Sequence, residues 1–497
     1  MPLGAFKTAM LGAAGSSGSN NFIGWWDWSA GASGQYRFNS ASNAAVNSDG
    51  DVVVQAQFQR YVGGTAHYLP LLVYINNDTT VKWNKMLGTT TSGHGSKLQY
   101  SVFQQGGVHF DGSGDIYAVV NGVAGQSGWS TDASGLANIG PICFQKYSKT
   151  DGSMTEERIL YKGQNYKVST GSTSTIGTEA VWIPGESDSM YHIWGIDIDD
   201  LTSNYMLGSA NSPNGGSHYA GGGGGYGDNW CSASTVYRTV GFNTEYRPII
   251  FTNGNSAFGF AYQLFYNSSA VSTSYYGMDC DMDTSGNKYA IMRHANYTPG
   301  MILKISGHSS QSMSIDWQQA YEGSASTNWF YPYSIKVDSS GNSYTVGYVE
   351  ATVDSFTGKH GFIQKHNSSG VLQWENMFTP VHSGTGKESF LYCVDVTDDD
   401  ENIVVTGGLA DNNNYQQLMV AKLPADGSGT GDYVTGTNAG TIKYYDGSSH
   451  ISSTTHNLTA TAESMNTGNH SSEVNGATTV TSGAPDSDLG TYRTQSI

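Results

Sequence analysis

The sequence predicts an all-β fold, a β-propeller of about six four-stranded blades with an N-terminal arm and a polar C-terminal extension. Three observations lead to this prediction. A hairpin pattern recurs along the chain, and a second strand–turn–strand pattern follows each copy. The composition, with 64 Gly and 32 Tyr among many Ser, Thr and Asn, favours turns and strands over helices. Units of about four strands, repeated in this way, are typical of propeller blades.

The clearest copy of the hairpin spans residues 335–347, with the sequence IKVDSSGNSYTVG. Alternating apolar residues predict a strand, Asp, Ser, Gly and Asn predict a tight turn, and Tyr-Thr-Val resumes the strand. Residues 280–289 repeat the pattern closely. The other copies span residues 46–54 and 108–117 and, in divergent form, 196–205 and 394–404. The sequence therefore places blade turns near residues 49, 111, 199, 283, 338 and 398.

The second pattern ends in an aromatic strand, and the chain also begins with one. Residues 362–374 form the clearest example, which ends at Trp374. Residues 22–28 carry three Trp ahead of the first hairpin. We expect this N-terminal strand to complete the last blade, because closing the ring leaves no blade interface exposed. The alternative outer strand for that blade is Tyr433-Val434.

The repeats define a propeller at residues 21–435, with an arm at 1–20 and a Thr/Ser/Gly-rich extension at 436–497. The largest insertion spans about 209–245 and contains five consecutive glycines. Composition alone predicts a flexible C-terminal tail. We expect both ends to be held by partner subunits in an assembly of several copies. The apolar residues of the N-terminal arm that would make this contact are Leu3, Phe6, Met10 and Leu11.

The charge balance argues against nucleic acid as a partner. With 23 Lys and Arg against 41 Asp and Glu, the formal net charge is −18, whereas phosphate binding needs clustered cations. The sequence contains no run of eighteen apolar residues, so it predicts no membrane-spanning helix. The four cysteines show no CxxC spacing, and we expect Cys143, Cys280 and Cys393 to be buried thiols in strands.

The hairpin copies resemble the bacterial β-propeller repeat family of the SBBP type, whose signature is a strand, Asp-x-x-Gly-Asn and then Tyr-x-x-Gly. Residues 335–347 match this signature, residues 280–289 match it nearly, and the other four copies depart from it in the turn. The chain also resembles structural proteins of marine tailed bacteriophages in its short apolar start and overall composition. The first resemblance implies no fixed catalytic residues, and the second implies a virion protein of the tail, neck or capsid surface.

Residues 279–287 resemble a calcium loop, with Asp279, Asp281 and Asp283 at alternate positions. The glutamate that completes an EF-hand loop is missing, and the hairpin repeat already accounts for Asp283. We therefore interpret this segment as a structural turn, with a calcium site as the alternative. The sequence predicts no other cofactor.

The aromatic, Gly-rich insertion is the candidate recognition surface. Exposed Tyr and Trp stack on sugar faces and anchor protein interfaces. The alternative is that such segments pack internally between loops. The candidate binding residues are His218, Tyr219, Tyr226 and Trp230.

Catalytic motifs are missing from the sequence. It has no HExxH, no G-x-S-x-G elbow and no Walker A lysine, and turns explain most of its aspartates. We therefore expect no enzymatic activity. The first hypothesis is a structural protein of a tailed-phage virion, most simply of the tail, which docks on other virion proteins through its arms and contacts a host glycan or receptor. The alternative is a secreted or cell-surface glycan-binding propeller, located outside the cell, and an enzyme on this scaffold is the third hypothesis.

Overall fold

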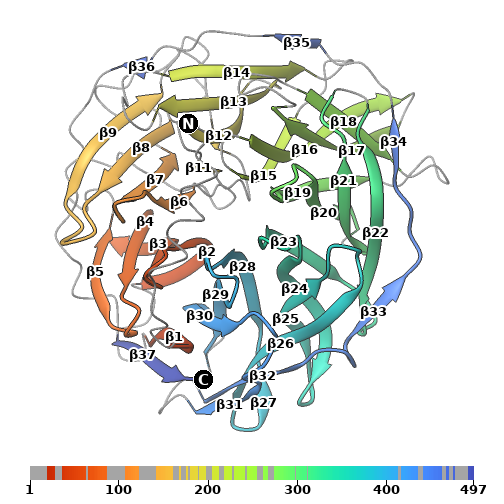
Figure 1. Ribbon diagram of the computed structural model, residues 1–497. Coiled ribbons are helices and arrows are strands. Elements are labelled where there is room, and N and C mark those ends of the chain that lie inside the picture. Colours follow the sequence, from red (N-terminus) through yellow and green to blue (C-terminus); the bar gives the residue numbers. More distant parts are fainter. Residues whose placement is uncertain are drawn as a thin grey trace.

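The computed structural model describes residues 20–27, 36–62, 65–86, 107–121, 142–160, 167–168, 175–176, 180–187, 190–197, 204–211, 218–226, 229–240, 243–253, 261–266, 274–296, 298–309, 312–411, 416–434, 440–461, 466–468, 474–475 and 491–497. Within these residues the strands form seven antiparallel sheets, which stand side by side in a ring (Figure 1). The predicted all-β propeller is confirmed. The described part of the chain contains no helix with the length and apolar character needed to cross a membrane.

Each sheet is one blade, with its first strand nearest the axis (Figure 1). Blade one contains β2 (Tyr36–Val46), β3 (Val52–Val62), β4 (Thr65–Ile75) and β5 (Val81–Met86). Blade two contains β6 (Val108–Phe110), β7 (Ile116–Asn121), β8 (Ile142–Tyr147) and β9 (Met154–Leu160). Blade three contains β12 (Ala180–Ser187), β13 (Met190–Asp197) and β14 (Asn204–Asn211), with β10 (Lys167–Val168) and β11 (Thr175–Ile176) paired to β12.

The second half of the ring is built in the same way. Blade four contains β15 (His218–Tyr226), β16 (Asn229–Val240), β17 (Asn243–Thr252) and β18 (Ala261–Tyr266). Blade five contains β19 (Tyr275–Met282), β20 (Lys288–His294), β21 (Gly300–Ser306) and β22 (Ser314–Gly323). Blade six contains β23 (Phe330–Val337), β24 (Ser343–Val353), β25 (Phe356–His366) and β26 (Leu372–His382), with β27 (Thr385–Gly386) beside β26. Blade seven contains β28 (Ser389–Val396), β29 (Asn402–Ala410), β30 (Gln416–Pro424) and β1 (Phe22–Asp27).

The predicted count of about six blades is wrong, because the segment taken for an insertion is a blade. Residues 209–245 contain the end of β14, all of β15 and β16, and the start of β17. Blade four carries no Asp-x-x-Gly-Asn turn, so the repeat pattern does not reveal it. The copy at residues 196–205 was also misplaced, since it joins the second and third main strands of blade three and does not follow an innermost strand.

The glycine run of residues 221–225 is the innermost strand of blade four, where side chains would not fit. A Cβ atom on Gly221 would lie 2.6 Å from the carbonyl oxygen of Met278, and one on Gly224 would lie 2.1 Å from Oδ1 of Asp281. Glycine therefore lets blade four approach blade five closely. This part of the predicted insertion is therefore a strand of the ring.

The hairpin turns follow the predicted chemistry. In blade six, Oδ1 of Asp338 accepts hydrogen bonds from the backbone N–H groups of Ser340 (3.0 Å) and Asn342 (2.8 Å). Gly341 supplies the positive φ of 78° that closes the turn. Asp283 and Asp111 anchor equivalent turns, whereas Asn47 and Thr397 take this place in blades one and seven.

The aromatic outer strands lock neighbouring blades together. Trp83, Trp317 and Trp374 donate their indole N–H to the carbonyl oxygens of Lys149 (3.2 Å), Ser368 (3.1 Å) and Ala425 (3.3 Å) of the next blade. Each indole also lies against a turn glycine of that blade: Gly152, Gly370 or Gly427. The repeated Trp of the sequence is thus an interblade contact.

The N-terminal strand closes the ring as predicted. β1 pairs antiparallel with β30, with Phe22 opposite Lys422 and Trp25 opposite Met419. The alternative strand β31 (Gly431–Val434) pairs instead with β32 (Thr441–Asp446), which lies on the outer edge of blade six. Blade seven therefore combines the N-terminal strand β1 with β28, β29 and β30, which lie much later in the sequence.

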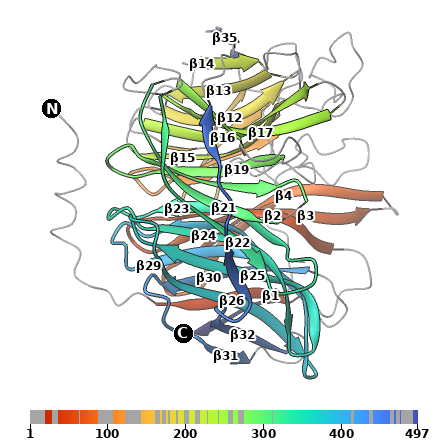
Figure 2. The ribbon, with the colours of Figure 1, turned by 90° about the vertical axis from the view of Figure 1, so that its right-hand side faces the viewer.

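The C-terminal extension is a belt around the ring. Its strands are β32, β33 (Ile451–Thr454), β34 (Thr459–Thr461), β35 (Asn466–Gly468), β36 (Val474–Asn475) and β37 (Thr491–Ser496). They pair in turn with the outer strands of blades six, five, four, three, two and seven. Figure 1 shows these blue segments on the periphery, and Figure 2 shows one of them crossing the outside of β22.

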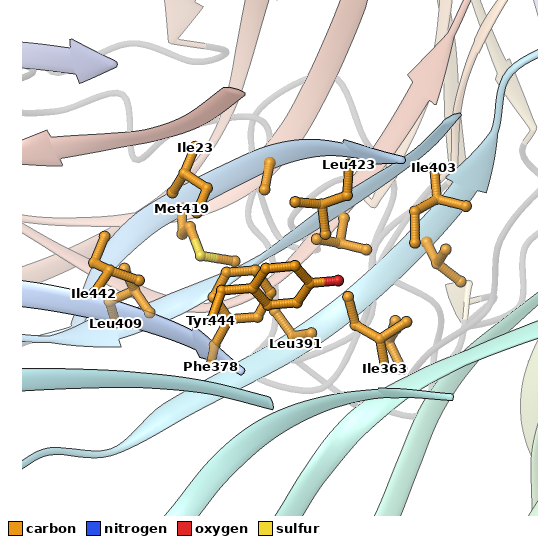
Figure 3. Close-up of a cluster of buried hydrophobic side chains, with 14 of the residues drawn as sticks. Ile23, Ile363, Phe378, Leu391, Ile403, Leu409, Met419, Leu423, Ile442 and Tyr444 are labelled. Carbon is orange, nitrogen blue, oxygen red and sulfur yellow. The ribbon is translucent and has the colours of Figure 1, made fainter. Parts of the chain in front are cut away.

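The belt corrects the prediction of a flexible tail. A few buried apolar residues anchor it to the blades, namely Ile442, Tyr444, Ile451 and Leu458. The ring of Tyr444 stacks on Phe378 with 4.7 Å between centroids, in the core between blades six and seven (Figure 3). Gln318 holds the backbone of Leu458 at both its N–H (2.7 Å) and its carbonyl (3.2 Å). The described strands of this polar segment thus pair with the chain's own blades, and contact with partner subunits stays a prediction.

Candidate functional site

A small cavity lies where the innermost strands meet. β2, β6, β15, β19, β23 and β28 line it, and it offers about 30 Å³ to the centres of water-sized molecules. A cavity of this size holds about two waters. Among the described residues, this cavity at the axis therefore has room for water but not for a sugar ring.

Charged side chains around the axis connect one blade to the next. Nζ of Lys336 in β23 lies 3.7 Å from Oδ2 of Asp281 and 3.9 Å from Oδ1 of Asp395. These three residues come from blades five, six and seven. Lys336 therefore neutralises part of the negative charge at the axis.

The buried carboxylates accept hydrogen bonds from the backbone of the neighbouring blade. Asp279 and Asp281 accept from the N–H groups of Ile335 and Val337, each at 3.0 Å. Asp395 accepts from the N–H of Val46 at 3.0 Å. Two of the interblade seams near the axis, between blades five and six and between blades seven and one, are thus polar, and each of these carboxylates accepts from a backbone donor.

The residues of the calcium alternative are used in these bonds. Asp279 and Asp281 bind the backbone of blade six, and Asp283 anchors its own turn. Among the described residues, no group of three His, Cys, Asp or Glu is placed to hold a metal ion. The geometry around these carboxylates is explained without a cation.

Burial shifts the protonation of this group. It raises the pKa of Asp279 to about 7 and that of Asp395 to about 6, although the backbone donors and Lys336 work in the opposite direction. Burial alone would lower the pKa of Lys336, but the attraction of Asp281 and Asp395 outweighs it and raises that pKa above its ordinary value. The carboxyl groups of Asp279 and Asp395 therefore change protonation between pH 5 and 8.

This shift predicts how an Asp279→Asn variant depends on pH. A carboxyl whose pKa is raised on folding stabilises the fold while protonated, and this contribution is lost as the pH rises through about 7. Between pH 5 and 8, the unfolding free energy of the variant should therefore rise by roughly 2 kcal/mol relative to wild type. Urea unfolding at each pH measures this difference.

In the difference between variant and wild type, the contributions of other titrating groups to the unfolding free energy cancel. Burial lowers the pKa of His360 and of His366 to about 4, which acts in both proteins alike. Asp49→Asn, at an exposed turn, is the control. A pH-independent difference for Asp279→Asn would contradict the assignment of this carboxyl.

Aromatic side chains gather at one mouth of the ring, on the face where β19, β23 and β28 begin. Tyr276, Tyr331 and Phe390 occupy the same repeat position in blades five, six and seven, ahead of the turn residues Asp283, Asp338 and Thr397. The turns of those blades lie at the opposite face. We define the mouth cluster as Tyr276, Arg293, Trp329, Tyr331, Tyr333, Tyr348, Lys359, Phe390 and Tyr392.

Successive contacts between side chains connect the members of the cluster from one blade to the next. The guanidinium of Arg293 lies 4.6 Å from the ring centroid of Tyr276 and 4.4 Å from that of Tyr331. Tyr331 stacks on Tyr348 at 5.0 Å, and Tyr348 meets Phe390 at 5.3 Å. An arginine is therefore held between rings of two blades.

The cluster is partly open to solvent. Tyr276, Arg293, Trp329, Tyr331 and Tyr333 are all half-buried, whereas Tyr348, Phe390 and Tyr392 are buried behind them. Tyr333 lies beside Tyr331 and meets the edge of Tyr392 at 5.0 Å. Burial raises the pKa of the Tyr392 hydroxyl above its ordinary value, so the phenol stays protonated.

Of the four predicted recognition residues, the structure describes only the side chain of Trp230. Trp230 is only 1% exposed, at the start of β16, so it is a core residue and not a binding residue. His218, Tyr219 and Tyr226 lie in β15, and their side chains fall outside the described part of the chain. The N-terminal arm with Leu3, Phe6, Met10 and Leu11 also lies outside the described residues. Cys280 and Cys393 are buried thiols as predicted, and the side chain of Cys143 lies outside the described part of the chain. Cys231, for which no prediction was made, is also a buried thiol.

Sequence reasoning missed the mouth cluster because no contiguous motif marks it. Its members come from β19, β20, β23, β24, β25 and β28 and from the turn before β23. The available signal was an aromatic residue at the same distance before three of the hairpin turns. A search for binding residues within the repeat, rather than in the insertion, would have found it.

Comparisons with known proteins find solved structures of low sequence identity. No family model and no curated protein matches the chain. A structure of a PL25 polysaccharide lyase, an ulvan lyase, has 10% identity, covers 82% of this chain and 95% of its own, and has a TM-score of 0.45. Drosophila Plexin A in complex with Semaphorin 1b has 7% identity, coverages of 82% and 92%, and a TM-score of 0.37. An exo-β-1,3-galactanase from Phanerochaete chrysosporium has 9% identity, coverages of 89% and 100%, and a TM-score of 0.32.

These comparisons correct the expectation that the chain is not an enzyme. Two of the three structures named here are enzymes, a lyase and a galactanase. The missing motifs were a poor criterion, because side chains from separate blades can meet without leaving a contiguous signature. The resemblances to SBBP-type repeats and to phage structural proteins stay predictions.

Proposed function

We propose that the protein binds carbohydrate at the mouth cluster, with the ring as a rigid scaffold. The observation that carries this proposal is the half-buried set Tyr276, Trp329, Tyr331 and Tyr333 beside the axis. Such side chains offer apolar ring surface to the C–H faces of sugars and polar atoms to their hydroxyls. Aromatic residues that only closed the blade interfaces would not need to reach solvent.

The position of the cluster supports the proposal. It spans blades five, six and seven at the mouth, where the blades converge toward the axis. The interblade hydrogen bonds that Asp279, Asp281 and Asp395 accept lie deeper in the ring and fix the strands that carry the cluster. A surface held in this way is organised before the ligand arrives, which lowers the entropic cost of binding.

Titration calorimetry with a panel of oligosaccharides tests the proposal. We expect at least one class to bind, and Tyr276→Ala and Tyr331→Leu to weaken its binding at least tenfold, which corresponds to about 1.4 kcal/mol. Tyr445→Leu is the matched control, because Tyr445 is also half-buried but lies in the belt strand β32. Equal affinities for all three variants would contradict binding at the mouth. Mass spectrometry of the glycan after incubation shows whether it is also cleaved.

The belt bears on the hypothesis of a phage virion protein. The extension that was expected to grip neighbouring subunits is paired with the chain's own blades at β32–β37. A virion location, attachment through the N-terminal arm, contact with a host surface and an extracellular location stay predictions. Glycan binding at the mouth is compatible with each of these locations.

A further inference from the structure

We infer that the ligand of the mouth cluster is an acidic glycan, whose carboxylate or sulfate groups are recognised by Arg293 and Lys359. This inference rests on the proposed function. Its starting point is the charge of the chain. With a net charge of −18 and only seven arginines, a pair of cations within one aromatic cluster contrasts with the rest of the molecule.

Most of the other lysines that lie over tyrosine rings have a structural use. Lys146, Lys304 and Lys365 lie over Tyr117, Tyr289 and Tyr344, which is the same arrangement in blades two, five and six. The ammonium of Lys146 pairs with Asp111, and those of Lys304 and Lys365 donate to the carbonyl oxygens of Ser368 and Ala425 in the next blade. Lys304 and Lys365 thus join blades, Lys146 anchors the hairpin turn of its own blade, and the repeat explains all three.

Arg293 and Lys359 do not belong to that arrangement. Lys359 lies in β25 with its ammonium 5.6 Å from the ring of Trp329, 5.4 Å from that of Tyr348 and 5.5 Å from that of Phe390. In the described part of the chain it forms no ion pair. Glu350 is opposite Lys359 in the strand register, but its carboxylate accepts a hydrogen bond from Thr327. Lys359 is thus a half-buried cation held by aromatic rings.

Arg293 is held in a comparable way on the neighbouring blade. The rings of Tyr276 and Tyr331, from blades five and six, lie within 4.6 Å of its guanidinium. A guanidinium that stacks on rings loses little rotamer freedom when it binds, and its planar N–H groups match the geometry of carboxylate and sulfate oxygens. Arg293 and Lys359 flank the stacked pair Tyr331 and Tyr348, so the two cations lie along one aromatic surface.

This arrangement selects an acidic sugar chain over an acidic protein. A sugar chain places its rings on Tyr276, Tyr331 and Tyr333 and its charges on the two cations. A folded acidic protein could offer carboxylates to Arg293 and Lys359, but it would not present the C–H faces of sugar rings to Tyr276, Tyr331 and Tyr333. A glycan that carries carboxylate or sulfate groups therefore fits both the aromatic and the charged members of the cluster.

The experiment compares neutral and acidic oligosaccharides of equal length, namely galactan, sulfated galactan and polygalacturonate fragments, by calorimetry at two salt concentrations. We expect an acidic chain to bind at least tenfold more tightly than the neutral one and to weaken as salt increases. Arg293→Gln and Lys359→Gln should each weaken acidic binding at least fivefold. Lys365→Gln, which removes a lysine over a tyrosine at a structural site, is the control and should not change it.

The outcomes separate the two proposals. Equal binding of neutral and acidic chains would overturn this inference but leave carbohydrate binding in place. No binding of any chain would overturn both. Thermal unfolding shows whether each variant is folded, and Arg293→Lys gives a second test at that position. Lysine keeps the positive charge but loses the planar guanidinium. We therefore expect the affinity of Arg293→Lys for the acidic oligosaccharide to lie between the affinities of wild type and Arg293→Gln. Undiminished acidic binding by both glutamine variants would also overturn the inference.

Discussion

Replacing Gly347 with alanine is expected to destabilise the protein by roughly 3 kcal/mol or more, the upper range for overpacking a close contact. A Cβ atom at this position would lie 2.0 Å from the carbonyl oxygen of Tyr331 and 2.8 Å from Cα of Pro332. Both neighbours are backbone atoms of the innermost strand β23, so they cannot rotate away. Urea unfolding of the variant measures the effect.

The same prediction holds for Gly407→Ala, because Gly407 is the equivalent residue of blade seven. Its Cβ would lie 1.9 Å from the carbonyl oxygen of Phe390. Both glycines face a register shift in the innermost strand, which brings the two strands unusually close. Gly112→Ala is the control, since a Cβ there would meet no atom within 4 Å. Glycine variants no less stable than Gly112→Ala would show that the strands do not approach in this way.

Tyr444→Ala is expected to cost about 3 to 5 kcal/mol, the range for removing a large aromatic side chain from a core. Tyr444 is fully buried, stacks on Phe378, and accepts a hydrogen bond from Nδ2 of Asn376 at 2.8 Å. It belongs to the belt, which the sequence alone would class as a flexible tail. Deletion of residues 436–497 should lower the stability at least as much.

The neighbouring residue supplies the control for the belt. Tyr445 lies in the same strand but is half-buried, so Tyr445→Ala should cost clearly less than Tyr444→Ala. Thermal and urea unfolding of both variants measure the difference. Equal effects, or a deletion that leaves stability unchanged, would mean that the belt does not pack on blade six.

Sequence reasoning identified the propeller because its hairpins are local. The turn at Asp338 and Gly341, and the Trp strands at Trp317 and Trp374, depend on residues a few positions apart. Ring closure by residues 22–27 followed from the Trp pattern and from the need to cover a blade edge. These features can be derived without tertiary information.

The parts that were missed depend on contacts between distant residues. Blade four was overlooked because Gly221 and Gly224 are required by the approach of blade five, which no local pattern reveals. The belt was overlooked because a few residues, such as Ile442 and Leu458, order a long polar segment through the edges of five blades and of β1. The mouth cluster was overlooked because Arg293 acquires its role only between rings of two blades.

A structure of the protein with a bound acidic oligosaccharide tests the central claim most directly. The account predicts sugar density against Tyr276, Tyr331 and Tyr333, with an acidic group within hydrogen-bonding distance of Arg293 or Lys359. Density confined to the turn face or to the outer edges of the blades would contradict it.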